Sequence, residues 1–226
     1  MKLLTTLILA GSAALAQAQA VCSSDGQSAP LALAERFLNA DCELCWSAPE
    51  SNQRIEPAAT LVLDWIVPSA RGEAAALSAA ATRDALQRLD LLHAAAPASS
   101  MVLGQAVTTS GHSLRVARGP ALANYVGASI ELSPPSGGPW TAVLLLVESI
   151  AAGSEGTPIA RQLVRNMLLT AWDLAPMPAA PQRLFESRPM SLPEGTRPER
   201  VQVVGWVQDA QGQLMALAQS ACPPPD

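Results

Sequence analysis

Two cysteines separated by two residues, Cys42-Glu43-Leu44-Cys45, have the spacing of a dithiol that can close into a disulfide and open again. Thiol–disulfide exchange needs a cysteine of lowered pKa as the attacking thiolate, and the N-terminus of a helix favours such an anion. A second cysteine one helical turn later resolves the mixed disulfide. We therefore predict a redox-active pair in which Cys42 attacks and Cys45 resolves.

The charges beside this pair leave a second interpretation open. Asp41 and Glu43 flank Cys42, and nearby negative charge disfavours a thiolate. A purely structural Cys42–Cys45 disulfide is therefore the alternative to a redox centre.

Other polar residues give weaker indications of chemistry. Asp64 lies in an apolar run, where a buried acid could transfer a proton behind the cysteine pair, although a capping role or a place at a strand end is the favoured interpretation. The only histidines, His93 and His112, are not at ligand spacing from the cysteines, so we predict no metal site. Residues 110–113 are typical of a turn, and the Gly-x-Ser-x-Gly motif of serine hydrolases is absent from the sequence. No cofactor is predicted.

The first 20 residues have the pattern of a cleaved signal peptide. Lys2 supplies a positive charge, and residues 3–15 form an uncharged apolar run that is too short to span a bilayer. Residues 18–20 (Ala-Gln-Ala) form a small-x-small cleavage site, with residues 16–18 as the alternative. The sequence therefore predicts a periplasmic or secreted protein that works in an oxidising compartment.

The composition of the remaining chain limits its partners. Lys2 is the only lysine among 14 basic residues, so 13 arginines face 19 acidic residues after cleavage, a net charge near −6. We find no clustered basic face, so we predict no nucleic-acid partner. No later stretch is long and apolar enough for a membrane span after cleavage. An unidentified protein or thiol partner fits the predicted redox chemistry.

Four cysteines remain after cleavage, and an even count in an exported protein indicates two disulfides. The short spacing favours Cys42 with Cys45, which leaves Cys22 with Cys222. This second bond would join the two ends of the mature chain as a structural disulfide.

The pattern of apolar residues predicts two unlike halves. The first alternates between strands and helices, and the second is rich in strands. In the first half we expect a strand or helix turn at 30–38, a short helix at 47–57, a buried strand at 60–67, a helix at 72–92, a strand at 101–109 and a short helix or loop at 119–126. In the second half we expect strands at 129–132, 141–148, 201–208 and 214–220, and we leave 161–173 open between helix and strand.

This order of elements resembles an exported bacterial family with a thioredoxin-like domain, known as domain of unknown function 1223. The matching stretches are 35–45, 61–65, 101–111, 159–165 and 203–208. Two positions depart from the family pattern. Trp46-Ser47 follow the second cysteine in place of Pro-Pro, and Leu103-Gly104 stand in place of Thr-Pro.

The resemblance implies an α/β fold, with a thioredoxin-like domain over residues 21–126 and a β-rich, sandwich-like domain over residues 127–226. It also implies that Gly104 lies in a substrate-facing loop opposite the cysteine pair, where the family has a proline. The expected function is thiol–disulfide redox chemistry on an unknown substrate. The alternative is a non-enzymatic binding or structural protein with purely structural disulfides.

Overall fold

The structure is a computed structural model that describes residues 22–47, 60–108, 111–133, 138–172 and 183–222. Over these residues the chain forms a four-stranded sheet, a seven-stranded sheet and two short α-helices. The strands are β1 (Cys22–Ser23), β2 (Ala32–Asn39), β3 (Thr60–Val67), β4 (Ser100–Ala106), β5 (Ser113–Leu122), β6 (Tyr125–Ser133), β7 (Trp140–Ile150), β8 (Arg161–Trp172), β9 (Leu184–Ser191), β10 (Val201–Gln208) and β11 (Leu214–Gln219). The helices are α1 (Glu43–Ser47) and α2 (Arg83–Leu91), and the 3-10 turns are η2 (Gly72–Ala74), η3 (Ser78–Ala80) and η4 (Pro198–Arg200).

The predicted fold class, an α/β fold with a thioredoxin-like N-terminal domain and a β-rich C-terminal half, is wrong, because the described residues form mostly strands in two sheets. The larger sheet has the order β11-β10-β7-β8-β3-β2-β4, so strands from both halves of the chain form one mostly antiparallel sheet. The smaller sheet, β1-β5-β6-β9, also draws on both halves, and the predicted boundary between residues 126 and 127 falls inside β6. The sequence pattern of a strand shows which faces are buried but not which distant strand it pairs with.

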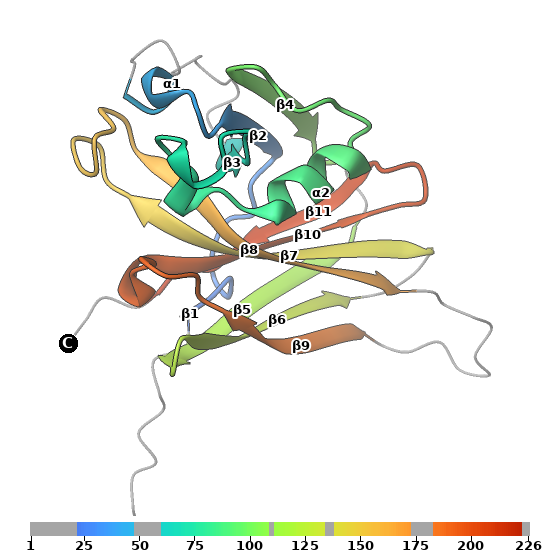
Figure 1. Cartoon of the computed structure of the whole chain (residues 1–226). Coiled ribbons are helices and arrows are strands. Elements are labelled where there is room, and N and C mark those ends of the chain that lie inside the picture. The colour runs from blue at the N-terminus through green and yellow to red at the C-terminus, as the bar shows by residue number, and fades with distance from the viewer. Residues whose placement is uncertain (1–21, 48–59, 109–110, 134–137, 173–182, 223–226) are drawn as a thin grey trace, which may run out of the picture.

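Figure 1 shows the strands in three layers. β2, β3 and β4 lie at the top with both helices, β7, β8, β10 and β11 cross the middle, and the four-stranded sheet lies below. β7 is buried on both faces because it lies in the middle layer. Val143, Leu145 and Val147 face the core shared with β2, β3 and α2, whereas Leu144 and Leu146 face the core shared with the smaller sheet. Such a strand is a continuous apolar run in the sequence.

The two sheets pack closely against each other at Gly205 in β10. A Cβ atom at this position would lie 2.7 Å from Cγ1 of Val116 and 2.9 Å from Cδ1 of Ile130, both in the smaller sheet. It would also lie 3.2 Å from the backbone oxygen of Val143 in the neighbouring strand. Glycine is therefore needed here to let the sheets pack.

Most of the predicted strands are confirmed. β3 has the predicted bounds of 60–67, and the strands predicted at 101–109, 129–132, 141–148, 201–208 and 214–220 correspond to β4, β6, β7, β10 and β11. The segment 30–38, left between strand and helix, is β2, and the open segment 161–173 is β8.

Of the helices predicted for the first half, the structure describes the one at 72–92 and only the first residue of the one at 47–57. In the segment 72–92 only the last part, α2, is an α-helix, and the first part forms the 3-10 turns η2 and η3. The Thr82 side chain caps α2 by accepting from the backbone N–H of Asp84. The helix predicted at 47–57 lies outside the described residues, except for Ser47, which is the last residue of α1. The predicted signal peptide also lies outside the described residues. The segment 119–126, expected to be a short helix or loop, holds the end of β5, a two-residue turn and the start of β6. Its turn residues Ala123 and Asn124 have φ angles of 47° and 63°.

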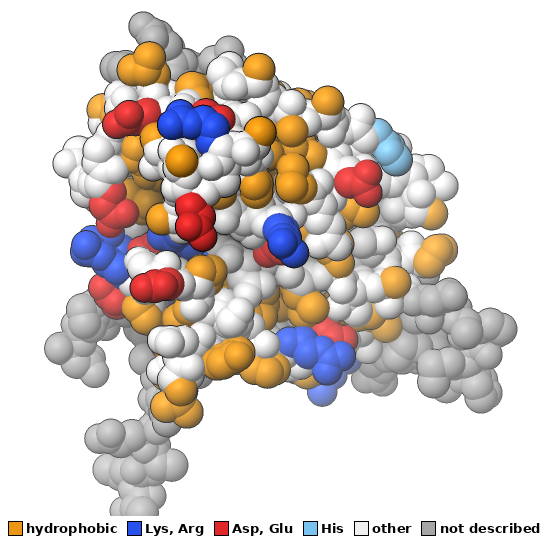
Figure 2. Space-filling view, in the orientation of Figure 1, with side chains coloured by type: hydrophobic (Ala, Val, Ile, Leu, Met, Phe, Trp, Pro, Cys, Tyr) orange, Lys and Arg blue, Asp and Glu red, His pale blue; other side chains and the backbone are white. Residues whose placement is uncertain are grey.

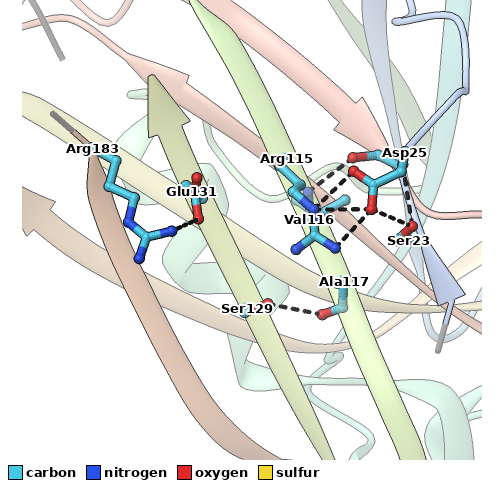
Figure 3. A network of polar contacts seen from close by, with 9 residues as sticks. Ser23, Asp25, Arg115, Val116, Ala117, Ser129, Glu131 and Arg183 are labelled. Carbon is cyan, nitrogen blue, oxygen red and sulfur yellow. Dashed lines mark hydrogen bonds and ion pairs between the residues drawn. The ribbon is translucent and has the colours of Figure 1, made fainter. Parts of the chain in front are cut away.

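The outer face of the smaller sheet carries polar pairs between neighbouring segments (Figure 3). Asp25, just after β1, accepts from Nε and Nη2 of Arg115 on β5 at 2.8 and 2.7 Å. Glu131 on β6 accepts from Arg183 at 3.3 Å. On the face shown in Figure 2, charges of both signs are scattered among neutral side chains, and no large area of one sign appears.

Candidate functional site

The Cys42–Cys45 disulfide lies where β2 ends and the short helix α1 begins. The two Cα atoms are 5.3 Å apart, and both residues are half-buried. The two residues between them are exposed, and Leu44 retains 76% of its accessible surface. The pair is therefore formed as predicted and lies at the surface.

Asn39, the last residue of β2, fixes the turn that leads into the disulfide. Its side-chain oxygen accepts from the backbone N–H of Asp41 at 2.9 Å, and its side-chain amide donates to the carbonyl of Pro97 at 3.0 Å. Its backbone oxygen accepts from the N–H of Cys42 at 2.9 Å. Asparagine suits this position because its short side chain hydrogen-bonds to the backbone two residues on.

The backbone of Cys45 contacts the sulfur of Cys42. The N–H of Cys45 lies 3.3 Å from the Cys42 sulfur and 3.1 Å from the Cys42 carbonyl oxygen. A hydrogen bond to sulfur favours the thiolate once the disulfide opens. Asp41 and Glu43 act in the opposite direction, because both are exposed acids beside Cys42. Arg71 lies 3.7 Å from Asp41 and offsets part of that charge.

Arg161, the first residue of β8, connects α1 to the interior. Its Nη2 donates to the carbonyl oxygens of Cys45 at 3.1 Å and Trp46 at 2.7 Å. Its Nε donates to the hydroxyl of Thr157 at 3.0 Å, and its guanidinium carbon lies 5.0 Å from the centre of the Trp46 ring. The Trp46 indole N–H donates to the carbonyl of Glu155 at 2.8 Å. These contacts hold α1 against the start of β8 and the loop that connects β7 to β8.

Asp64 in β3 is fully buried between two arginines. Its Oδ1 lies 2.8 Å from Nε of Arg36 and 3.0 Å from Nη1 of Arg161, and its Oδ2 accepts from the backbone N–H of Gln162 at 3.1 Å. Burial raises the pKa of Asp64, and the two guanidinium groups and the amide oppose that rise. Burial likewise lowers the pKa of Arg161, and the Asp64 carboxylate opposes that fall. Asp64 is therefore connected to the cysteine turn through Arg161, which contacts both the Asp64 carboxylate and the Cys45 carbonyl.

Arg161, Arg36 and Trp46 are not among the site residues predicted from the sequence. A signal for the two arginines was available, because each lies in or beside an apolar strand where an unpaired charge is costly. Asp64, a lone acid in an apolar strand, was the obvious partner. Nothing local indicated that the same guanidinium would also bind the backbone of the cysteine turn.

Gly104 is not brought to the cysteine pair. It pairs with Ala34 in β2, five residues before Asn39, which corresponds to roughly 16 Å along the strand. The chain beside the turn is instead the segment just before β4, where Pro97 and Ser99 accept hydrogen bonds from Asn39. The role of Gly104 in facing a substrate stays a prediction.

The Cys22–Cys222 disulfide forms as expected. It joins β1 to the end of the chain that follows β11, with 4.1 Å between the Cα atoms and a sequence separation of 200 residues. Ser23 and Ala221 exchange two backbone hydrogen bonds beside it. Cys22 is buried and belongs to β1, which lies in the lower part of Figure 1, whereas α1 lies at the top, so the two disulfides occupy different regions.

Neither histidine belongs to a metal-binding group. Over the residues that the structure describes, no three His, Cys, Asp or Glu side chains are placed to hold a metal ion. His112 packs edge-on against Trp140, with 5.0 Å between the ring centres. In the same ranges, no helix has the length and apolar character needed to cross a membrane.

No family model, curated protein or solved structure matches the chain. The resemblance to domain of unknown function 1223 therefore stays a prediction.

Proposed function

We propose that the protein exchanges electrons with a thiol-containing partner through Cys42 and Cys45. The observation that carries this proposal is that the pair forms a disulfide at the surface. Hydrogen bonds from Arg161 to the Cys45 and Trp46 carbonyls fix the backbone of that turn. A reactive disulfide needs access for the attacking thiol and a fixed position for the resolving one. The partner is an unidentified protein or small thiol.

The exchange proceeds in two displacement steps. A thiolate of a partner dithiol attacks the sulfur of Cys42, which breaks the Cys42–Cys45 bond, forms a mixed disulfide and releases Cys45 as a thiolate that takes up a proton. The partner's second thiol loses its proton and attacks the partner sulfur of the mixed disulfide. This step closes a disulfide on the partner and releases Cys42 as a thiolate, which takes up a proton. The partner loses two electrons and two protons, and the pair gains them. In reverse, Cys42 attacks a partner disulfide and Cys45 resolves the intermediate.

Chain entropy argues against a mainly stabilising role for this bond. A cross-link over a sequence separation of 3 is worth only about 2 kcal/mol in the unfolded-state model, whereas one over 200 residues is worth about 5 kcal/mol. The Cys22–Cys222 bond is therefore the one suited to stabilise the fold.

A second candidate is a non-enzymatic binding or structural protein in which both disulfides are permanent. The acids beside Cys42 favour it, because Asp41 and Glu43 raise the cost of forming a thiolate. The two candidates differ in one measurable property, which is whether the Cys42 sulfur takes part in exchange.

We also infer that the protein is exported to a periplasm or secreted. Both disulfides persist most readily in an oxidising compartment, and residues 1–20 have the pattern of a signal peptide. N-terminal sequencing of the protein from an exporting host tests this inference. The expected first residue is Val21, and a chain that still begins at Met1 would contradict it.

The exchange itself is tested by trapping. In the Cys45→Ser variant the resolving thiol is gone. The Cys42 thiolate attacks an added peptide that contains a disulfide, one peptide thiol leaves, and the mixed disulfide on Cys42 should accumulate. The matched control is Cys42→Ser, which leaves Cys45 alone and should trap far less. Equal trapping by the two variants, or none by either, would favour the permanent disulfide. Turnover of a disulfide substrate by the wild-type protein is the second readout.

A further inference from the structure

The helix that carries Cys45 is too short to hold its own shape. α1 has five residues, and isolated helices of that length are unstable in water. The last carbonyls of a helix also lack partners within it. In α1 two of these carbonyls, those of Cys45 and Trp46, accept hydrogen bonds from Nη2 of Arg161. The position of the Cys45 backbone therefore depends on a residue 116 positions further along the chain.

The guanidinium group that supplies these bonds is itself fixed. Arg161 is 1% exposed, its Nη1 is paired with Asp64, and its Nε donates to Thr157. The Trp46 ring lies against its face, with the guanidinium carbon 5.0 Å from the ring centre. Because each of its three nitrogens has a partner, Arg161 has little freedom to follow a moving helix.

We propose that Arg161 is a positioning residue for thiol–disulfide exchange. It keeps the backbone of Cys45 in place after the disulfide opens, so that the Cys45 thiol stays within reach of a mixed disulfide on Cys42. This inference rests on the proposed function. A resolving thiol that is held near its target has a high effective concentration, which speeds the displacement and favours the closed disulfide.

The direct test replaces Arg161 by lysine in the mature protein. Arg161→Lys keeps a positive charge near Asp64, but a single ammonium group cannot reproduce the forked contacts to Asp64, Thr157 and both carbonyls. The readout is the equilibrium between disulfide and dithiol in glutathione buffers. We expect the equilibrium constant to shift about tenfold toward the dithiol, which is about 30 mV for this two-electron couple. Mixed disulfides on Cys42 should also resolve more slowly.

Arg88→Lys is the matched control. Arg88 is also 1% exposed, pairs with a buried acid, Glu35, at 2.6 Å, and lies 5.0 Å from the ring centre of a tryptophan, Trp206. The partners of Arg88 lie in β2 and β10, not in α1. Both variants should lose stability, but only Arg161→Lys should shift the redox equilibrium. An equal shift in both, or no shift in Arg161→Lys, would overturn the proposal.

Trp46→Phe serves if Arg161→Lys does not fold. It keeps an aromatic ring beside the guanidinium and removes the hydrogen bond from the indole N–H to Glu155. The expected shift is smaller and in the same direction, with Trp206→Phe as control, and an unchanged equilibrium in Trp46→Phe would overturn the proposal.

Failure of the proposed exchange function can be told apart from failure of the Arg161 proposal by the trapping experiment. It would appear as a Cys45→Ser variant that traps no more of the disulfide peptide than Cys42→Ser does. The disulfide–dithiol equilibrium can still be measured then in dithiothreitol buffers, so the comparison of Arg161→Lys with Arg88→Lys still decides whether Arg161 positions the pair.

Discussion

The Nη1 atom of Arg161 lies 3.0 Å from Oδ1 of Asp64, and neither side chain is exposed to solvent. This contact links the cysteine turn to the centre of the larger sheet, because the same guanidinium also donates to the carbonyls of Cys45 and Trp46. The Arg161–Asp64 ion pair therefore joins β3 to β8 and also positions the backbone of the cysteine turn at the surface.

Asp64→Asn should destabilise the protein by about 3–5 kcal/mol, because it removes the carboxylate that both Arg36 and Arg161 contact in the interior. Urea unfolding at neutral pH measures the change. Glu131→Gln is the control, since its partner Arg183 is largely exposed and their ion pair at the surface should be worth less than about 1 kcal/mol. A loss of similar size in both variants would show that burial of the cluster does not matter.

Gly205→Ala should destabilise the fold by about 1–3 kcal/mol, because the new Cβ would meet Val116, Ile130 and the backbone of Val143. Gly127→Ala is the matched control in a strand of the smaller sheet, where a Cβ would meet nothing within 4 Å. Thermal or urea unfolding of the two variants tests the packing of the two sheets. If Gly205→Ala were as stable as Gly127→Ala, the sheets would not approach each other at Gly205.

Loss of the Cys22–Cys222 bond should cost more stability than loss of the Cys42–Cys45 bond. The double serine variant at 22 and 222 should lose up to about 5 kcal/mol, and the one at 42 and 45 about 2 kcal/mol or less, because the enclosed loops differ so much in length. Unfolding free energies of the two variants provide the comparison. The opposite order would make Cys42–Cys45 the structural disulfide.

The Asp25 carboxyl should titrate below its ordinary pKa of 3.8, because its hydrogen bonds with Arg115 and Ser23 favour the charged form. Since the folded-state pKa is the lower one, the pair's small contribution to stability is present above about pH 4 and is lost as the pH falls through the lowered value. An NMR titration measures the midpoint, which Arg115→Gln should return toward 3.8. The same midpoint in both proteins would mean that the contact in Figure 3 is not maintained in solution.

The sequence predicts local structure well wherever burial sets the pattern. β3 is buried along most of its length, and its residues are apolar except for Thr60 and Asp64, so its bounds follow from the sequence. The alanine-rich segment 72–92 misled the prediction because high helix propensity favours one long helix. In the structure, hydrogen bonds from Leu77 to Ala40 and from Thr82 to Ile66 hold its first half in short turns.

The overall fold and half of the site could not be predicted in this way. β3 and β8 are joined by a single pair, Asp64 with Leu163, at a sequence separation that no local pattern reports. The spacing of Cys42 and Cys45 predicts their bond, but Arg161 reaches them only because β8 lies beside β3. Where the partner strand is unknown, the partner of a buried charge is unknown as well.

The reduction potential of the Cys42–Cys45 pair tests the central claim most directly. It is measured by equilibrating the mature protein in glutathione buffers of graded redox ratio and trapping the free thiols with an alkylating reagent. A redox-active pair should have a potential between about −270 and −120 mV, the range of thiol–disulfide catalysts. A potential below about −300 mV, typical of structural disulfides, would contradict the proposed function.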